Sequence, residues 1–200
     1  MKKYLVIGTI AMVGALALAG CSIIKPPAVY EPLGELSQKE YATVELSSTT
    51  VVGGVTLTGE YTSTRADDGY HITYSYEQIA TFGEKDGEIV IPDSYKVTYS
   101  GTAVVSNGSI VTKSGDDVDL PLGQLTASGL DFSSKNFSDV KQGEGSFSAS
   151  VADVGAFFGK SVSGSGMTVE VHYTETAFTT LTVRYTSTGN ASVTLEYRFR

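Results

Sequence analysis

The chain of 200 residues contains a single cysteine, Cys21, no tryptophan, and only two histidines and five prolines. One cysteine cannot form a disulfide within the chain, so a hydrophobic core must hold the fold together. Basic residues are also few, since 14 Lys and Arg stand against 22 Asp and Glu. The net charge of −8 repels nucleic acid, and no basic patch with interleaved aromatic residues occurs. We therefore expect no nucleic-acid binding.

Motifs that mark common catalytic and cofactor sites are missing as well. The sequence contains no P-loop, no G-x-G-x-x-G fingerprint and no G-x-S-x-G elbow. Ser138-Asp139-Val140-Lys141 fits S-x-x-K, but its companion motifs K-T-G and S-D-N are absent. His71 and His172 alternate onto the polar side of their segments, and a zinc site needs at least a third ligand. We predict that the protein is not an enzyme and holds neither a metal nor a cofactor.

The N-terminus combines a short basic start with a long uncharged run. Lys2 and Lys3 precede seventeen uncharged residues, Tyr4 to Gly20. This order is typical of a secretory signal, whose apolar segment ends in small residues at the cleavage point. The run is slightly shorter than the about 20 apolar residues of a transmembrane helix. A signal peptide is therefore favoured over a retained anchor helix.

Leu18-Ala19-Gly20-Cys21 ends this run and resembles the lipobox of bacterial lipoproteins. In that family a diacylglycerol is joined to the cysteine sulfur, and a dedicated peptidase then cuts before the cysteine. The resemblance implies a signal peptide over residues 1–20 and acylation, such as palmitate, at Cys21. It also implies attachment to a bacterial membrane facing outside the cytoplasm. The anchor could lie in the outer leaflet of the cell membrane or in an outer membrane. A spare cysteine beside an ordinary cleavage site is the alternative.

The chain after the signal divides into a tether and one domain. Residues 21–40 hold three of the five prolines, and proline favours extended backbone, so we predict a lipidated tether there. From residue 41 to residue 200 apolar and polar residues alternate, as in Ser192–Phe199. Strict alternation indicates half-buried antiparallel strands. Turn signals such as Asn107-Gly108 separate about ten of them.

The predicted strands each offer one apolar face, yet the chain has almost no long amphipathic helix to cover it. We therefore predict an all-β antiparallel domain, curled into a half-barrel or paired into a sandwich, with one or two short helices. Residues 115–145 lose the alternation and are the expected cover. This layout resembles the half-barrels of bacterial lipoprotein carriers and lipid-binding lipoproteins, and the resemblance implies a lipid ligand.

Tyrosines are the remaining clue to function. Their apolar rings and polar tips suit a concave face that holds an amphipathic ligand, although the same residues serve equally as core and rim of a sheet. Binding of a lipid or other hydrophobic ligand predicts a cavity on this face. A structural or protein-interaction role in the envelope predicts a filled core and an exposed edge or apolar patch. The tyrosines that share the apolar face are Tyr61, Tyr74, Tyr76, Tyr99, Tyr173, Tyr185 and Tyr197.

Overall fold

The structure is a computed structural model that describes residues 29–80, 84–85, 88–89, 96–125, 129–159 and 162–200. The predicted signal peptide, Cys21 and the first part of the predicted tether lie outside the described residues. In the described part of the chain, every helix is too short or too polar to cross a membrane.

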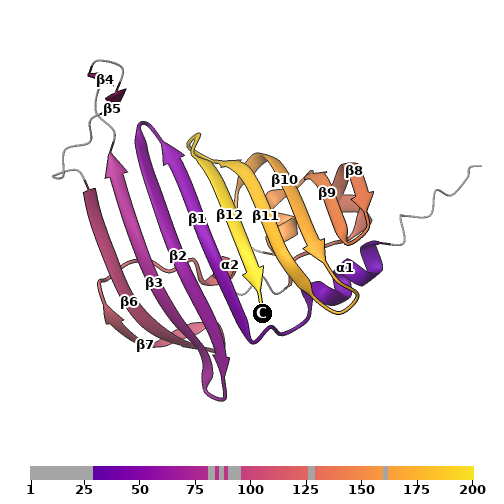
Figure 1. The fold of residues 1–200 in the computed structure, drawn as a ribbon, viewed down its shortest axis with the longest axis horizontal. Helices are drawn as coiled ribbons and strands as arrows, with labels where there is room; N and C mark the ends of the chain where they lie inside the picture. Colours follow the sequence, from indigo (N-terminus) through magenta and orange to yellow (C-terminus); the bar gives the residue numbers. More distant parts are fainter. Residues whose placement is uncertain (1–28, 81–83, 86–87, 90–95, 126–128, 160–161) are drawn as a thin grey trace, which may run out of the picture.

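Ten strands form one antiparallel sheet, in the order β7-β6-β3-β2-β1-β12-β11-β10-β9-β8 (Figure 1). The all-β prediction is confirmed, and the single open sheet is a curled half-barrel rather than a sandwich. A separate pair is formed by β4 (Glu84–Lys85) and β5 (Glu88–Ile89). The strands of the large sheet are β1 (Thr43–Val52), β2 (Val55–Ala66), β3 (Gly69–Ala80), β6 (Lys96–Ser106), β7 (Ser109–Gly115), β8 (Phe137–Gly143), β9 (Ser146–Val151), β10 (Gly164–Tyr173), β11 (Phe178–Ser187) and β12 (Ser192–Phe199).

The sheet consists of two meanders that meet in its centre. We call β1, β2, β3, β6 and β7 the first wing, and β8 to β12 the second wing. The first strand, β1, pairs with the last, β12, in a register that sets Val44 opposite Phe199 and Leu46 opposite Tyr197. Residues more than a hundred positions apart in the sequence therefore close the fold.

Alternation along the strands gives the sheet a polar face and an apolar face. In β12 exposed and buried residues follow one another with a period of two. Helices α1 (Tyr30–Ser37), α2 (Leu122–Leu125) and α3 (Val154–Phe158) share one core with the apolar face. Leu33, Leu125 and Phe157 are each at most 1% exposed. The helices thus cover part of the apolar face, and α1 lies within the segment predicted as a tether.

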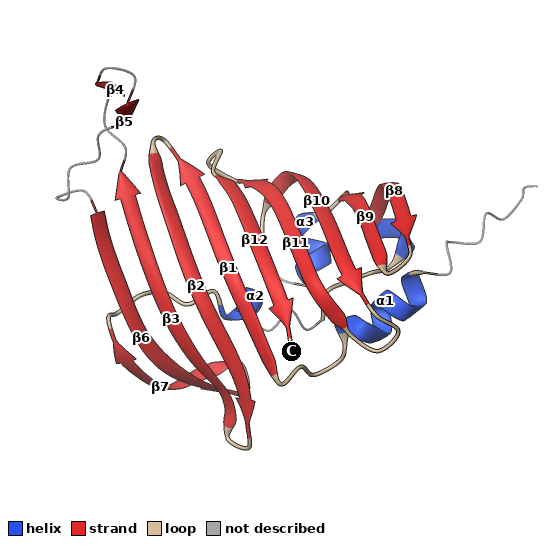
Figure 2. Cartoon of the chain, in the orientation of Figure 1, coloured by secondary structure: helices blue, strands red, loops and turns tan. Residues whose placement is uncertain are grey.

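The connection from β7 to β8 runs back across the apolar face from one edge of the sheet to the other (Figure 2). Its described residues 116–125 and 129–136 include α2 and the 3-10 helix Ser134–Asn136. Leu125, Leu130 and Phe132 of this connection are buried in the core. The connection is therefore the cover that was expected over 115–145, except that residues 137–143 form the edge strand β8.

The core is densest under the second wing, where phenylalanine rings pack against one another. Phe132 lies 5.5 Å from Phe157 and 5.7 Å from Phe178, measured between ring centroids. Phe137 lies 5.3 Å from Phe147. Edge-to-face and tilted ring pairs of this kind add to the energy of burial. This half of the apolar face is filled by protein.

Candidate binding surface on the apolar face

The seven tyrosines predicted to face a ligand fall into two groups. Tyr61, Tyr74, Tyr185 and Tyr197 are between 1% and 7% exposed, and they belong to the core. The others, Tyr76, Tyr99 and Tyr173, are half-buried. Strand order places Tyr76 beside Tyr99 on neighbouring strands. Tyr173 ends β10 in the second wing, five strand positions from β3, or about 24 Å measured along the sheet across the strands.

Hydroxyl groups of the buried tyrosines hold the cover against the sheet. Tyr74 Oη donates a hydrogen bond to the Asp116 carbonyl oxygen, 2.6 Å away, where the connection leaves β7. Tyr185 is hydrogen-bonded to Gln124 of α2; burial raises the pKa of Tyr185, and this hydrogen bond partly offsets the effect. These two tyrosines therefore have structural partners.

Tyr197 differs, because its hydroxyl is fully buried and has no hydrogen-bond partner among the described residues. Burial raises the pKa of Tyr197 far above its ordinary value, and the nearby Tyr185 hydroxyl adds to the rise. A buried hydroxyl without a partner destabilises a fold by about 1–3 kcal/mol. The Tyr197 hydroxyl is therefore a destabilising group in the centre of the sheet.

The described helices and the described part of the β7–β8 connection leave part of the apolar face uncovered at the end of the first wing where β1 runs into β2. We call it the open tract. It consists of three rows of residues that run across neighbouring strands. The first row runs from Ser48 on β1 to Tyr99 on β6, the second runs from Thr50 on β1 to Val97 on β6, and the third is the pair of Val52 and Val55. In Figures 1 and 2 the helices lie over the centre and the second wing, away from this end. Its members are Ser48, Thr50, Val52, Val55, Leu57, Tyr76, Gln78, Val97 and Tyr99.

Side chains of the open tract are partly accessible and carry no charge. Val52 is 37% exposed and Val97 is 39% exposed, while the remaining members are half-buried. The Tyr76 and Tyr99 rings lie 6.1 Å apart between centroids, tilted by 47°. Burial, and then the neighbouring Tyr99, raise the pKa of Tyr76. Its hydroxyl thus stays neutral at physiological pH and can donate a hydrogen bond.

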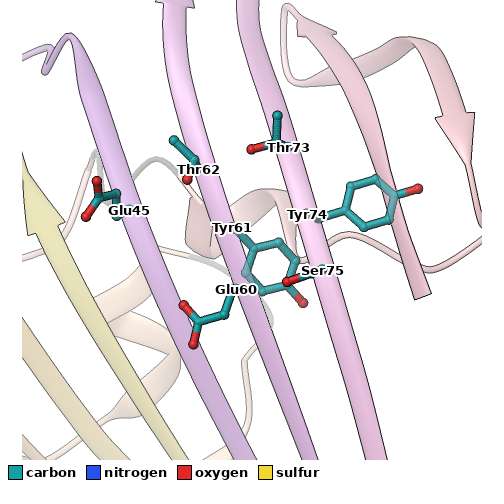
Figure 3. A pocket seen from close by; sticks show the side chains of 7 residues that line it. All are labelled: Glu45, Glu60, Tyr61, Thr62, Thr73, Tyr74 and Ser75. Carbon is teal, nitrogen blue, oxygen red and sulfur yellow. The ribbon is translucent and has the colours of Figure 1, made fainter. Parts of the chain in front are cut away.

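The opposite, polar face carries a hollow of about 340 Å³ that spans β1, β2 and β3 (Figure 3). Glu45 and Glu60 line it with Thr62, Thr73 and Ser75. Each carboxylate already has a partner, since Arg200 lies 3.2 Å from Glu45 and Ser47 Oγ donates to Glu60 over 2.8 Å. Both carboxylates are therefore engaged in side-chain contacts on the polar face.

A second hollow, of about 510 Å³, lies between α1 and residues 129–133. Tyr30, Leu130 and Phe132 give it an apolar floor, and Glu31 and Asp131 bring carboxylates to its lining. The Ser133 hydroxyl donates to Asp131 and lowers the pKa of that carboxyl. An acidic lining disfavours anionic ligands here.

Neither histidine reaches a metal-like arrangement. His71 Nε2 lies 2.8 Å from Asp68 Oδ1, and His172 Nε2 lies 3.4 Å from Glu170 Oε1; both pairs face solvent. Within the described ranges, no group of three or more His, Cys, Asp or Glu side chains could hold a metal ion. Ser138 and Lys141 of the S-x-x-K sequence lie in β8, where the register shifts between them.

Comparison with known proteins adds no assignment, since no protein-family model and no curated protein matches the chain. The open tract is therefore identified as a candidate surface from the sequence and the geometry. Alternation placed Tyr76 and Tyr99 on the correct face but did not single out Val52, Val55, Leu57 or Val97. One available signal was the stretch from Leu46 to Gly59, which contains no charged residue.

Proposed function

We propose that this protein is a lipid-anchored bacterial envelope protein whose β domain binds a hydrophobic ligand on the open tract. The supporting observation is the contrast between the two halves of the apolar face. Protein fills the half under the second wing, while the open tract leaves apolar side chains, among them Val52 and Val97, in contact with solvent. Covering apolar surface stabilises a complex by about 25 cal/mol for each Å² removed from water.

The open tract also has the composition of a small-molecule site. Ligand sites are mostly apolar and contain a few polar groups that orient the ligand. Here the apolar residues come with two tyrosine hydroxyls and the side chains of Ser48, Thr50 and Gln78. The tract is a strip across β1, β2, β3 and β6, so a ligand would lie along the sheet and not in the cavity that was expected from the sequence.

The position of the proposed anchor supports a function of the β domain close to a membrane. Eight residue steps separate Cys21 from Val29, the first described residue. Fully extended, they span at most about 29 Å. An acylated Cys21 would therefore hold the domain within reach of the lipid surface, which is a source of hydrophobic ligands.

A protein-interaction role is the second candidate, and the edge strand β7 favours it. Ile110 and Val111 are 39% and 58% exposed there, and unpaired strand edges invite strand addition. The edge also carries features that oppose such pairing. The pairing of β7 with β6 shifts register between Val104 and Val105 of β6. In β7, Lys113 bonds to Asp117 and to the Val118 carbonyl oxygen. We therefore rank this role second.

Photocrosslinking of the full chain in membranes tests the proposal. The variants Tyr76→p-benzoylphenylalanine and Tyr99→p-benzoylphenylalanine place a photoreactive group in the open tract, and Val111→p-benzoylphenylalanine is the matched control on β7. After irradiation, mass spectrometry of the purified protein should show a lipid adduct at positions 76 and 99 and none at position 111.

Two results would contradict the proposal. Equal lipid labelling at all three positions would mean contact with the bilayer without a site. Adducts with another protein at position 111 and no lipid adduct at positions 76 and 99 would favour the protein-interaction role at β7 instead.

A further inference from the structure

We infer that the ligand of the open tract is a neutral amphiphile, with an uncharged hydroxyl or ester head on an apolar chain, rather than a lipid with an anionic head. This inference rests on the proposed function and specifies its ligand class. It follows from the charges and hydrogen-bonding groups that the described residues present to the tract.

An anionic head would be favoured by a cationic side chain close to the open tract. On the apolar face of the first wing, the described Lys and Arg residues are Arg65 and Lys113. Arg65 lies eight residues along β2 from Leu57, about 27 Å away, and is paired with Glu40. Lys113 is held by Asp117 and the Val118 carbonyl oxygen. Both cations are therefore distant from the tract or already occupied.

Lys96 is closer in sequence but belongs to the other face. It pairs with Ile79 in the register, whereas Val97 pairs with Gln78 inside the open tract. Its ammonium lies 2.7 Å from Glu77 Oε1. A charge that loses water without gaining a partner is strongly disfavoured, and the acidic protein repels anions in general. An anionic head would thus meet an unfavourable surface.

Neutral polar groups, by contrast, find partners in the tract. Thr50, Leu57, Gln78 and Val97 form one continuous row across β1, β2, β3 and β6. The row alternates hydroxyl or amide groups with apolar side chains. A Gln amide both donates and accepts hydrogen bonds, and a Thr hydroxyl does the same. Together with the Tyr76 and Tyr99 hydroxyls, they match the hydroxyl and ester oxygens of a neutral head.

The test compares two photoactivatable probes on the full chain in membranes. One is a palmitoyl monoacylglycerol and the other an alkyl sulfonate, which is charged at every accessible pH. Both carry the same diazirine and alkyne groups on chains of equal length. We expect monoacylglycerol labelling of the wild type to exceed sulfonate labelling about tenfold, which corresponds to about 1.4 kcal/mol.

A gain-of-function variant makes the test specific to the tract. Gln78→Lys places a cation in the central row and should raise sulfonate labelling several-fold. Ser75→Lys adds the same charge on the polar face of β3, where Ser75 is exposed, and should leave the labelling ratio unchanged. A shift of equal size in both variants would overturn the inference, because net charge alone would then explain selectivity.

The possible failures can be told apart. Equal labelling of the wild type by both probes, lost in the double variant Tyr76→Ala/Tyr99→Ala, would refute neutral-head selectivity and leave ligand binding at the tract intact. Labelling by either probe that the double variant does not reduce would refute the proposed function as well.

Discussion

Tyrosine serves three different purposes on one face of this sheet. Tyr74 and Tyr185 use their hydroxyls to hold the cover. Tyr76 and Tyr99 stay partly accessible in the open tract. Tyr197 buries a hydroxyl that has no hydrogen-bond partner in the described part of the chain. The role of a tyrosine on this face therefore depends on whether the helices and the β7–β8 connection cover its strand position.

The Tyr197 hydroxyl leads to a prediction about stability. Tyr197→Phe removes the unpartnered group and keeps the ring, so the free energy of unfolding should rise by about 1 kcal/mol. Tyr74→Phe is the matched control and should lower it by a similar amount, because its hydrogen bond to the Asp116 carbonyl oxygen is lost. Urea unfolding monitored by circular dichroism measures both. A destabilised Tyr197→Phe protein would show that the hydroxyl is satisfied in solution.

Among the elements, the first wing depends on glycine where tyrosine rings lie close to the strands. A Cβ atom at Gly101 would lie 2.3 Å from Tyr74 Oη and 2.3 Å from the Ser114 carbonyl oxygen. Glycine within a strand often marks such a close approach. Gly101 thus makes room for the tyrosine that holds the start of the cover.

Alanine substitutions at Gly101 and at a second, uncrowded glycine should therefore show whether steric crowding or backbone preference determines the change in stability. Gly101→Ala should lower the free energy of unfolding by about 1–3 kcal/mol, because backbone as well as side chain must move. Gly34 lies inside α1 with nothing within 4 Å of an added Cβ. Gly34→Ala should raise stability by about 0.5–1 kcal/mol. Thermal unfolding compares the pair, and a neutral Gly101→Ala variant would contradict the described packing.

At the scale of the whole molecule, the two wings are joined by the pairing of β1 with β12. The cover then crosses from the free edge of one wing to that of the other. Helix α1, which follows the proposed anchor segment, packs Leu33 and Leu36 into the core. A pull on the anchor would thus be transmitted to the folded domain at α1.

The anchor itself gives a prediction at this scale. Cys21→Ser removes the thiol that acylation requires, so the protein should leave the membrane fraction on cell fractionation. The intact wild-type protein should show the added mass of acyl chains. These chains hold the protein on the membrane because each buried methylene contributes about 0.8 kcal/mol to anchoring. Cys21→Ser protein that stays with the membrane, together with wild type of unmodified mass, would contradict the lipoprotein assignment.

Much of the fold was predictable from local pattern. Period-two alternation in Ser192–Phe199 identified a half-buried strand, and Asn107-Gly108 identified a hairpin, because side-chain direction and turn geometry are local properties. The edge strand β8 was missed, since Phe137–Gly143 contains Asp139 with a φ of +52° and an irregular register that breaks the alternation. Helix α1 falls within the segment predicted as a tether, and the local sequence did not indicate it because its burial depends on contacts with distant strands.

The amino-acid sequence alone was sufficient to predict an antiparallel β domain and the strand faces, because both depend on residue type and spacing. Only the tertiary structure decided which part of the apolar face is covered. That outcome depends on where the connection between β7 and β8 crosses the sheet and on how β1 meets β12. Both are long-range contacts, so neighbouring tyrosines with the same local pattern become core in one row and accessible surface in the next.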